Sequence, residues 1–248
     1  GSSFYWPMML LPRHKREAIA AIYAFCRVLD DEVDNNNDKI GAVKNLNYFA
    51  QQIDAIYQEE NFEMPTHPVA QALLFHVGKF KLPKLHFQSI LAGFKRDLAG
   101  DMVKPSLHEL DEYCSDVASS VGLLAIEIFG YKNESTRKFA INLGKFMQLI
   151  NIIRDVNEDA QKGRIYLPRE CLQYYGIENI TAPEIRQNPY DQKLTEARAE
   201  LGKVAEKYLE SANANLGLQD KETMRPALFM RDIYVHYLNI MKQNNWHY

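Results

Sequence analysis

The 248-residue chain lacks an apolar run long enough to cross a bilayer as a helix, which takes about 20 residues. Even the stretch 121–129 is interrupted by Glu127. It also lacks a basic excess, because 29 Lys and Arg residues stand against 32 Asp and Glu residues. We therefore exclude nucleic acid as a partner and expect a soluble, cytoplasmic protein.

The chain contains few cysteines and lacks the sequence pattern typical of a dinucleotide-binding site. The three cysteines are widely spaced, which fits neither a disulfide framework nor a zinc site and is consistent with a reducing cytosol. No glycine-rich strand-to-helix fingerprint is present, so the sequence gives no support for NADPH as a cofactor.

Helical periodicity runs through the chain, whereas strand-like alternation is nearly absent. We expect an all-α fold formed by a single domain over residues 1–248. The predicted helices cover residues 13–34, 40–58, 69–80, 83–98, 106–130, 134–161, 190–216 and 224–243. Ser106 and Glu109 are spaced as a helix-starting capping box. The segment 162–189 is rich in Gly and Pro and is a candidate active-site flap.

The N-terminal segment 4–11 is apolar and is followed by basic residues between Arg13 and Arg16. It is too short to span a membrane and has no small-residue cleavage site. We interpret it as the packed start of the fold. Peripheral contact with the inner membrane face stays open as a second role.

An acidic stripe interrupts the first long helix. Residues 18–26 are apolar nearly all round, as in a buried helix. Arg27, Asp30, Asp31 and Asp34 then follow at steps of three or four, which places them on one helical face. A DDxxD string alone is usually a solvated helix end, so this stripe by itself does not decide between a metal site and a charged surface.

A second stripe lies in the apolar helix predicted near position 150. Gln148, Asn151, Asp155 and Asp159 recur at steps of three or four, with Glu158 beside them. Aspartates four residues apart repel each other unless a cation or a proton neutralises them. Carboxylate oxygens suit Mg²⁺, which typically completes its coordination with water and phosphate. Two such stripes facing each other therefore predict a site for a diphosphate.

With these motifs the sequence resembles the squalene and phytoene synthase family. The segment 23–34 resembles the first aspartate-rich motif of the family, and 151–159 followed by 163–168 resembles the second. The similarity extends from residue 3 to near residue 246. The resemblance implies a large helical bundle of the isoprenoid synthase type, with a central apolar cavity, that joins two isoprenoid diphosphates head-to-head.

The resemblance also implies roles for individual residues. Two or three Mg²⁺ ions would be held by Asp30, Asp34, Asp155 and Asp159, with Asp31, Asn151 and Glu158 in or beside the coordination sphere. Diphosphate binding and its ionisation would involve Ser3, Tyr23, Arg27, Arg164 and Tyr166. Further substrate contacts would come from Phe4, Tyr113, Val117, Val121, Gln148 and Asn151.

Two of these roles have structural alternatives. Arg27 can bind phosphate bidentately, but it can equally pair with Asp30 or Asp31 within its own helix. The small and apolar residues around Val117 and Val121 suit a prenyl channel and a helix–helix contact equally well.

Within the family, segments 3–6, 67–70 and 225–227 most resemble the bacterial hopanoid branch, in which two farnesyl diphosphates form a cyclopropylcarbinyl diphosphate. Phytoene, dehydrosqualene or squalene formation is the alternative within the family. A class I terpene cyclase and a chain-elongating prenyltransferase fit the second stripe less well. A non-catalytic assembly or binding relative is the alternative from another class, and the oligomeric state stays open.

Overall fold

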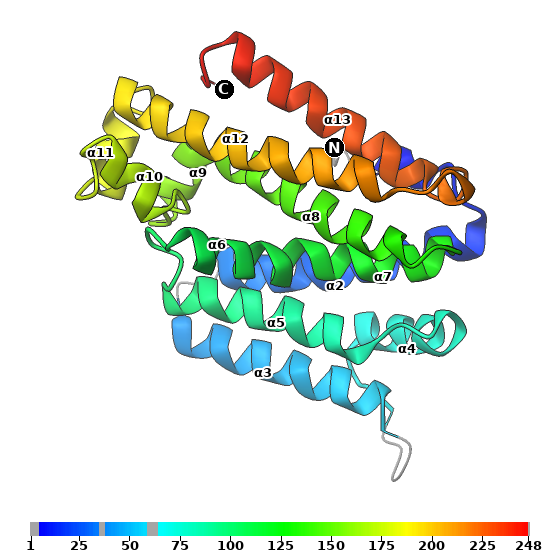
Figure 1. Cartoon of the computed structure of the whole chain (residues 1–248). Helices are drawn as coiled ribbons and strands as arrows, with labels where there is room; N and C mark the ends of the chain where they lie inside the picture. Colours follow the sequence, from blue (N-terminus) through cyan, green and yellow to red (C-terminus); the bar gives the residue numbers. More distant parts are fainter. Residues whose placement is uncertain (1–4, 35–37, 59–63, 248) are drawn as a thin grey trace.

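The computed structural model describes residues 5–34, 38–58 and 64–247, which form an array of helices (Figure 1). The longer helices are α2 (Arg13–Asp34), α3 (Lys39–Ile56), α4 (Pro68–Phe80), α5 (Lys84–Ala99), α8 (Ser135–Arg154), α12 (Gln192–Asn215) and α13 (Arg225–Gln243). The shorter ones are α1 (Tyr5–Met8), α6 (Leu107–Cys114), α7 (Ser120–Phe129), α9 (Val156–Gln161), α10 (Arg169–Tyr174) and α11 (Ala182–Gln187). A π-helical turn, η1 (Ser115–Ser119), joins α6 to α7, and a 3₁₀ turn, η2 (Leu218–Asp220), precedes α13.

The all-α expectation is confirmed, and local signals explain most helix ends. Asp38 accepts the backbone N–H of Ile40 at the start of α3, as an N-cap residue does. Ser106 and Glu109 form the predicted capping box of α6. Gly100, in the left-handed conformation, ends α5. The bounds of most helices agree with the sequence-based ranges to within about two residues.

Helix α8 lies at the centre of the arrangement. In Figure 1 the helices follow one another from α13 and α12 through α8, then α7 and α2, to α5 and α3. Their buried apolar side chains form one continuous cluster. Within the described ranges, no helix combines the length and the apolar composition that a bilayer crossing requires.

Two glycines let α8 and the η1–α7 segment approach to backbone contact. A Cβ atom at Gly144 would lie 2.8 Å from backbone atoms of Ala118, and one at Gly122 would lie 2.9 Å from the carbonyl oxygen of Ala140. Real Cβ atoms do not tolerate such distances, because interiors are close-packed and backbone atoms cannot yield. The two helical segments are therefore held together by contacts that only glycine permits.

The prediction of one continuous helix over 134–161 is wrong, because the helix breaks at Asp155 into α8 and α9. The guanidinium of Arg154 donates to both carboxylate oxygens of Asp155 at 2.6 Å. Neighbouring residues in a regular helix do not face each other, so this pairing accompanies a local departure from helical geometry. The range 134–161 would make this the longest helix of the chain, but α12 has 24 residues and α8 has 20.

The helix predicted over 106–130 is likewise not uniform. It passes through the π turn η1 between α6 and α7. A π turn accommodates one extra residue, which shifts every following side chain by about 100° around the axis. The residues before and after η1 therefore do not share the single face that their spacing predicts.

The start of α8 is fixed by a carboxylate from a distant part of the chain. Asp220 is buried and accepts hydrogen bonds from the backbone N–H groups of Lys132 (2.8 Å) and Asn133 (2.9 Å) and from the Thr136 hydroxyl (2.6 Å). Burial alone would raise its pKa, but these hydrogen bonds outweigh burial and lower it. Asp220 thus connects the α12–α13 turn to the central helix.

We expect Asp220→Asn to lower the free energy of unfolding by about 2–3 kcal/mol, because hydrogen bonds to a charged acceptor are lost and an amide N–H₂ meets other donors. Because the folded-state pKa of Asp220 is depressed, its contribution is present above the unfolded pKa and is lost as the pH falls through the folded pKa. Urea unfolding at pH 7 and at acidic pH measures both effects. The exposed Asp101→Asn is the matched control, and an equal loss in both variants would contradict the assigned role.

Candidate active site

Segments far apart in the sequence bring their charged residues to one end of the bundle. Asp34 ends α2, Asp155 separates α8 from α9, and Arg164 follows α9. The Lys162 ammonium contacts one carboxylate oxygen of Asp34 at 2.5 Å, and the Arg164 guanidinium contacts the other at 2.8 Å. We call this end of the bundle, between α2 and the segment after α9, the mouth.

The two cations at Asp34 set its electrostatics. Burial raises the pKa of Asp34, but the hydrogen bond from Lys162 and the charge and hydrogen bond of Arg164 outweigh burial and lower it. The side chains of Asp34 and Arg164 are each 15% exposed, so solvent screens their contact less than a surface pair. Asp34 is therefore ionised and tied across the mouth.

The remaining charges of the first stripe pair within α2. Arg27 contacts Asp30 at 3.2 Å and Asp31 at 2.8 Å, so the structure shows the intrahelical pairing that the sequence left as an alternative. Burial and the neighbouring charge of Asp34 raise the pKa of Asp30, although Arg27 opposes them. In the first stripe, the ionised form of Asp30 is therefore energetically unfavourable.

Among the described residues of the second stripe, too, one carboxylate is paired with a cation and another is not. Asp155 takes two hydrogen bonds from Arg154, whose guanidinium lies 5.3 Å from the Tyr237 ring centroid. Burial, followed by the charge of Asp155, raises the pKa of Asp159 to about 7. Glu158 is exposed.

Asn151 presents a buried acceptor towards this region. Its Oδ1 atom has no hydrogen-bond partner among the described residues, while its side chain forms a hydrogen bond with Tyr234. A buried carbonyl oxygen without a donor is unfavourable, and ligand binding is one way to satisfy it. Asn151 also lines the cavity described below.

Among the described residues, no three His, Cys, Asp or Glu side chains converge closely enough to form a preassembled metal site. The contacts already given explain this arrangement. Asp34 is held by Lys162 and Arg164, and Asp155 is held by Arg154. In this conformation, Lys and Arg side chains neutralise carboxylates that the family resemblance predicts to be metal ligands.

Asp97 belongs to the candidate site but was missed by the sequence reasoning. It lies in the last turn of α5 and accepts hydrogen bonds from the hydroxyls of Tyr113 at 2.8 Å and Tyr166 at 2.7 Å, and the two tyrosine rings stack 5.4 Å apart. Burial raises the pKa of Asp97 to about 6, against the lowering effect of the hydrogen bonds. A lone charge in a helix turn carries no signal for such a cluster, because its partners lie on other segments.

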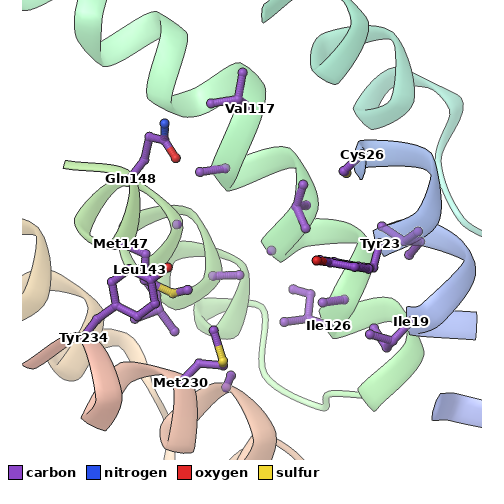
Figure 2. Close-up of a pocket in the computed structure, with 18 of the residues that line it drawn as sticks. Ile19, Tyr23, Cys26, Val117, Ile126, Leu143, Met147, Gln148, Met230 and Tyr234 are labelled. Carbon is purple, nitrogen blue, oxygen red and sulfur yellow. The ribbon is translucent and has the colours of Figure 1, made fainter. Parts of the chain in front are cut away.

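Inward from the mouth, the bundle encloses a cavity of about 330 Å³ (Figure 2). Figure 2 shows Tyr23 reaching in from α2, Met147 from α8, and Tyr234 from α13. Most other lining residues are aliphatic or small. The sequence-based candidates that line it are Tyr23, Val117, Val121, Gln148 and Asn151.

Tyr113 does not line this cavity, although its spacing places it on the face of Val117 and Val121. The π turn that begins at Ser115 explains the divergence, because its extra residue rotates the side chains within and after it relative to Tyr113. Tyr113 points instead to Asp97 and Tyr166. Ser3 and Phe4 lie outside the described residues.

The geometry combines an apolar chamber with carboxylates and guanidinium groups gathered at the mouth. Such a chamber suits a hydrocarbon, and the charged groups of the mouth suit a polyanionic head group together with cations. A model of squalene/phytoene synthase matches residues 1–248. The chain belongs to the squalene/phytoene synthase family. It is therefore an enzyme of isoprenoid biosynthesis with the all-α fold of that family.

Individual members of the family agree with this assignment. A presqualene diphosphate synthase of Sinorhizobium fredii is 33% identical over 241 residues, covering 97% of this chain and 84% of the relative. A phytoene synthase of Arthrospira platensis is 33% identical over 207 residues, covering 78% of this chain and 64% of the relative. A crystal structure of a dehydrosqualene synthase in complex with ligand superimposes with a TM-score of 0.84 at 30% identity, covering 98% of this chain and 82% of that chain.

The raised pKa of Asp159 predicts a pH-dependent stability. Folded Asp159 keeps its proton up to about pH 7, whereas an unfolded aspartate loses it near pH 4. Asp159 thus binds more proton in the folded state within this window, so its contribution to stability falls as the pH rises from 4 to 7.

We expect Asp159→Asn to flatten this decrease and to unfold at higher urea concentration than the wild type at pH 8. Unfolding is followed in EDTA, so that divalent cations do not mask the repulsion from Asp155. The exposed neighbour Glu158→Gln serves as the control and should keep the wild-type profile. An unchanged slope in Asp159→Asn would show that Asp159 is not the group responsible.

Proposed function

We propose that this enzyme joins two molecules of farnesyl diphosphate head-to-head into presqualene diphosphate and releases one diphosphate, as in the hopanoid branch of the family. The observation that carries the proposal is an apolar cavity lined by the two helices that carry the acidic stripes, with Tyr23 and Cys26 on α2 and Gln148 and Asn151 on α8. The presqualene diphosphate synthases among the relatives, one of them matching 97% of this chain, support the farnesyl substrate. The phytoene synthase match favours a longer prenyl substrate as the second candidate.

We propose that Asp30, Asp34, Asp155 and Asp159 hold two or three Mg²⁺ ions, with Asp31, Asn151 and Glu158 in or beside the coordination sphere. The residues fit this cation in three respects. Their donors are oxygens, the raised pKa of Asp159 reflects unrelieved repulsion as well as burial, and the Asn151 carbonyl oxygen lacks a partner. When bound, Mg²⁺ neutralises the charge that develops on the leaving diphosphate.

The basic residues at the mouth are the proposed diphosphate ligands. Arg27 and Arg164 now contact carboxylates, and their guanidinium groups match phosphate oxygens equally well. A diphosphate that enters the mouth would offer Lys162 and Arg164 an anionic partner in place of Asp34. The same exchange would release Asp34 to bind a metal ion.

The apolar lining has two proposed roles in the reaction. It holds the hydrocarbon chains, and it keeps water away from the allylic cation that forms when the C–O bond of one substrate breaks. Val117 and Val121 lie on one wall, and Tyr23 lies on another. Closing the cyclopropane ring of presqualene diphosphate then requires the loss of one proton.

Product analysis tests the proposal. Purified enzyme with Mg²⁺ and farnesyl diphosphate should form presqualene diphosphate with or without NADPH, and EDTA should stop the reaction. Asp34→Asn should abolish turnover while the protein stays folded, because a proposed metal ligand is lost. Squalene formed only with NADPH, or a C40 product from geranylgeranyl diphosphate alone, would replace the proposed reaction. Absence of diphosphate release from either substrate would instead favour a non-catalytic relative.

The Asp97 cluster yields a separate prediction. We propose that Asp97 positions the hydroxyls of Tyr113 and Tyr166 beside the mouth, and that Tyr166 acts together with Arg164 in diphosphate ionisation. Asp97→Asn keeps the size but loses the charge, so we expect kcat to fall by about 10- to 100-fold, as for other supporting residues, with little change in KM. A rise in KM alone, with kcat unchanged, would contradict a positioning role. Thermal unfolding of the same variant checks that the protein is folded.

A further inference from the structure

At the end of the bundle opposite the mouth, the turn between α1 and α2 exposes apolar side chains. Helix α2 has 22 residues and is therefore roughly 33 Å long, and it begins here and ends at Asp34 (Figure 1). Met9 is 45% exposed and Leu10 is 58% exposed. Arg13 and Arg16 follow within two turns, and the Arg16 guanidinium reaches the Met9 sulfur at 3.6 Å.

Helix α4 extends this surface. The His14 ring stacks on Phe80 with their centroids 6.3 Å apart, which brings the outer face of α4 next to the start of α2. That face exposes Phe75, 67% accessible, and the Lys79 ammonium lies 5.6 Å from its ring centroid. We call Met9, Leu10, Arg13, Arg16, Phe75 and Lys79 together the corner surface.

The charge of the corner surface is positive although the chain carries −3 overall. Arg13 pairs with Glu17 at 2.7 Å. Within the described part of the chain, Arg16 and Lys79 have no carboxylate within ion-pair distance. The surface thus combines exposed apolar side chains with two cations that form no ion pair with a described residue.

A depression next to the corner surface shares a lining residue with the cavity. A surface depression of about 190 Å³ is lined by Leu10, Leu11, Pro12 and Lys15, and also by Phe129. Phe129 lines the large cavity as well. Its backbone carbonyl accepts a hydrogen bond from Lys15 at 2.7 Å, which fixes the end of α7 against the start of α2. Phe129 therefore borders both the surface depression and the cavity.

We propose that the corner surface docks on the anionic face of a lipid bilayer. Met9, Leu10 and Phe75 would enter the boundary between head groups and acyl chains, and Arg16 and Lys79 would lie at the level of the lipid phosphates. This placement brings the inner end of the cavity next to lipid. Transfer of a prenyl chain past Phe129 rests on the proposed function, whereas the docking itself does not.

Vesicle flotation tests the docking in the absence of substrate and metal. The full chain is mixed with vesicles of phosphatidylcholine alone or with 30 mol% phosphatidylglycerol, at low and high salt. We expect binding to the anionic vesicles that weakens with salt. The pair Met9→Glu and Leu10→Glu should lower the partition coefficient at least about ten-fold, since apolar burial is lost and negative charge is added. The pair Arg16→Glu and Lys79→Glu should lower it similarly, because each cation contributes about five-fold near such a surface.

The matched control is the pair Ile40→Glu and Val43→Glu on α3, whose native side chains are 70% and 47% exposed but lie outside the corner surface. The control should bind vesicles as the wild type does, and circular dichroism checks that all variants fold. Equal binding by the Met9 and Leu10 variant, or equal binding to neutral and anionic vesicles, would overturn the proposal. A dimer in light scattering that this variant abolishes, without vesicle binding, would assign the surface to a second copy instead.

Turnover of farnesyl diphosphate in detergent separates this proposal from the proposed function. The Met9 and Leu10 variant should turn over at the wild-type rate there, since neither residue is part of the mouth. If the wild type binds anionic vesicles but has no turnover, the docking stands and the proposed reaction fails.

Discussion

The contact of Asp34 with Lys162 and Arg164 is the interaction on which the architecture of the mouth depends. Carboxylates gathered at one end of an apolar bundle repel each other and lose hydration. The segment after α9 supplies the cations that offset this cost, and the contact joins residues about 130 positions apart. The same segment carries Tyr166 to Asp97. Electrostatic compensation therefore also assembles the part of the site that the acidic stripes do not contain.

Close backbone packing shapes the space behind the mouth. Gly122 and Gly144 bring α7 and α8 into contact, and both residues also line the cavity. The same small residues thus form a helix–helix contact and line the cavity. The π turn then separates the polar cluster of Tyr113 from Val121 on the apolar wall, so that hydroxyl groups and hydrocarbon lining come from one continuous helical segment.

The bundle is polarised along α2. One end carries the ion pairs of the mouth, and the other carries exposed Met9 and Leu10 with basic neighbours. Between them lies a cavity lined mainly by apolar groups. An amphiphilic ligand with a charged head and a hydrocarbon tail matches this polarity in one orientation, with the head group towards Asp34.

Sequence periodicity was enough to determine the helical class, most helix bounds and the two acidic stripes, because these depend on residues close together in the chain. It could not place Asp97 against Tyr113 and Tyr166, the Asp220 cap of α8, or Lys162 beside Asp34, because each contact joins segments that meet only after folding. The break at Asp155 and the π turn also escaped it, since neither contains Gly or Pro. Tertiary structure decided these features because packing and charge compensation outweigh local helical preference where distant side chains compete for the same space.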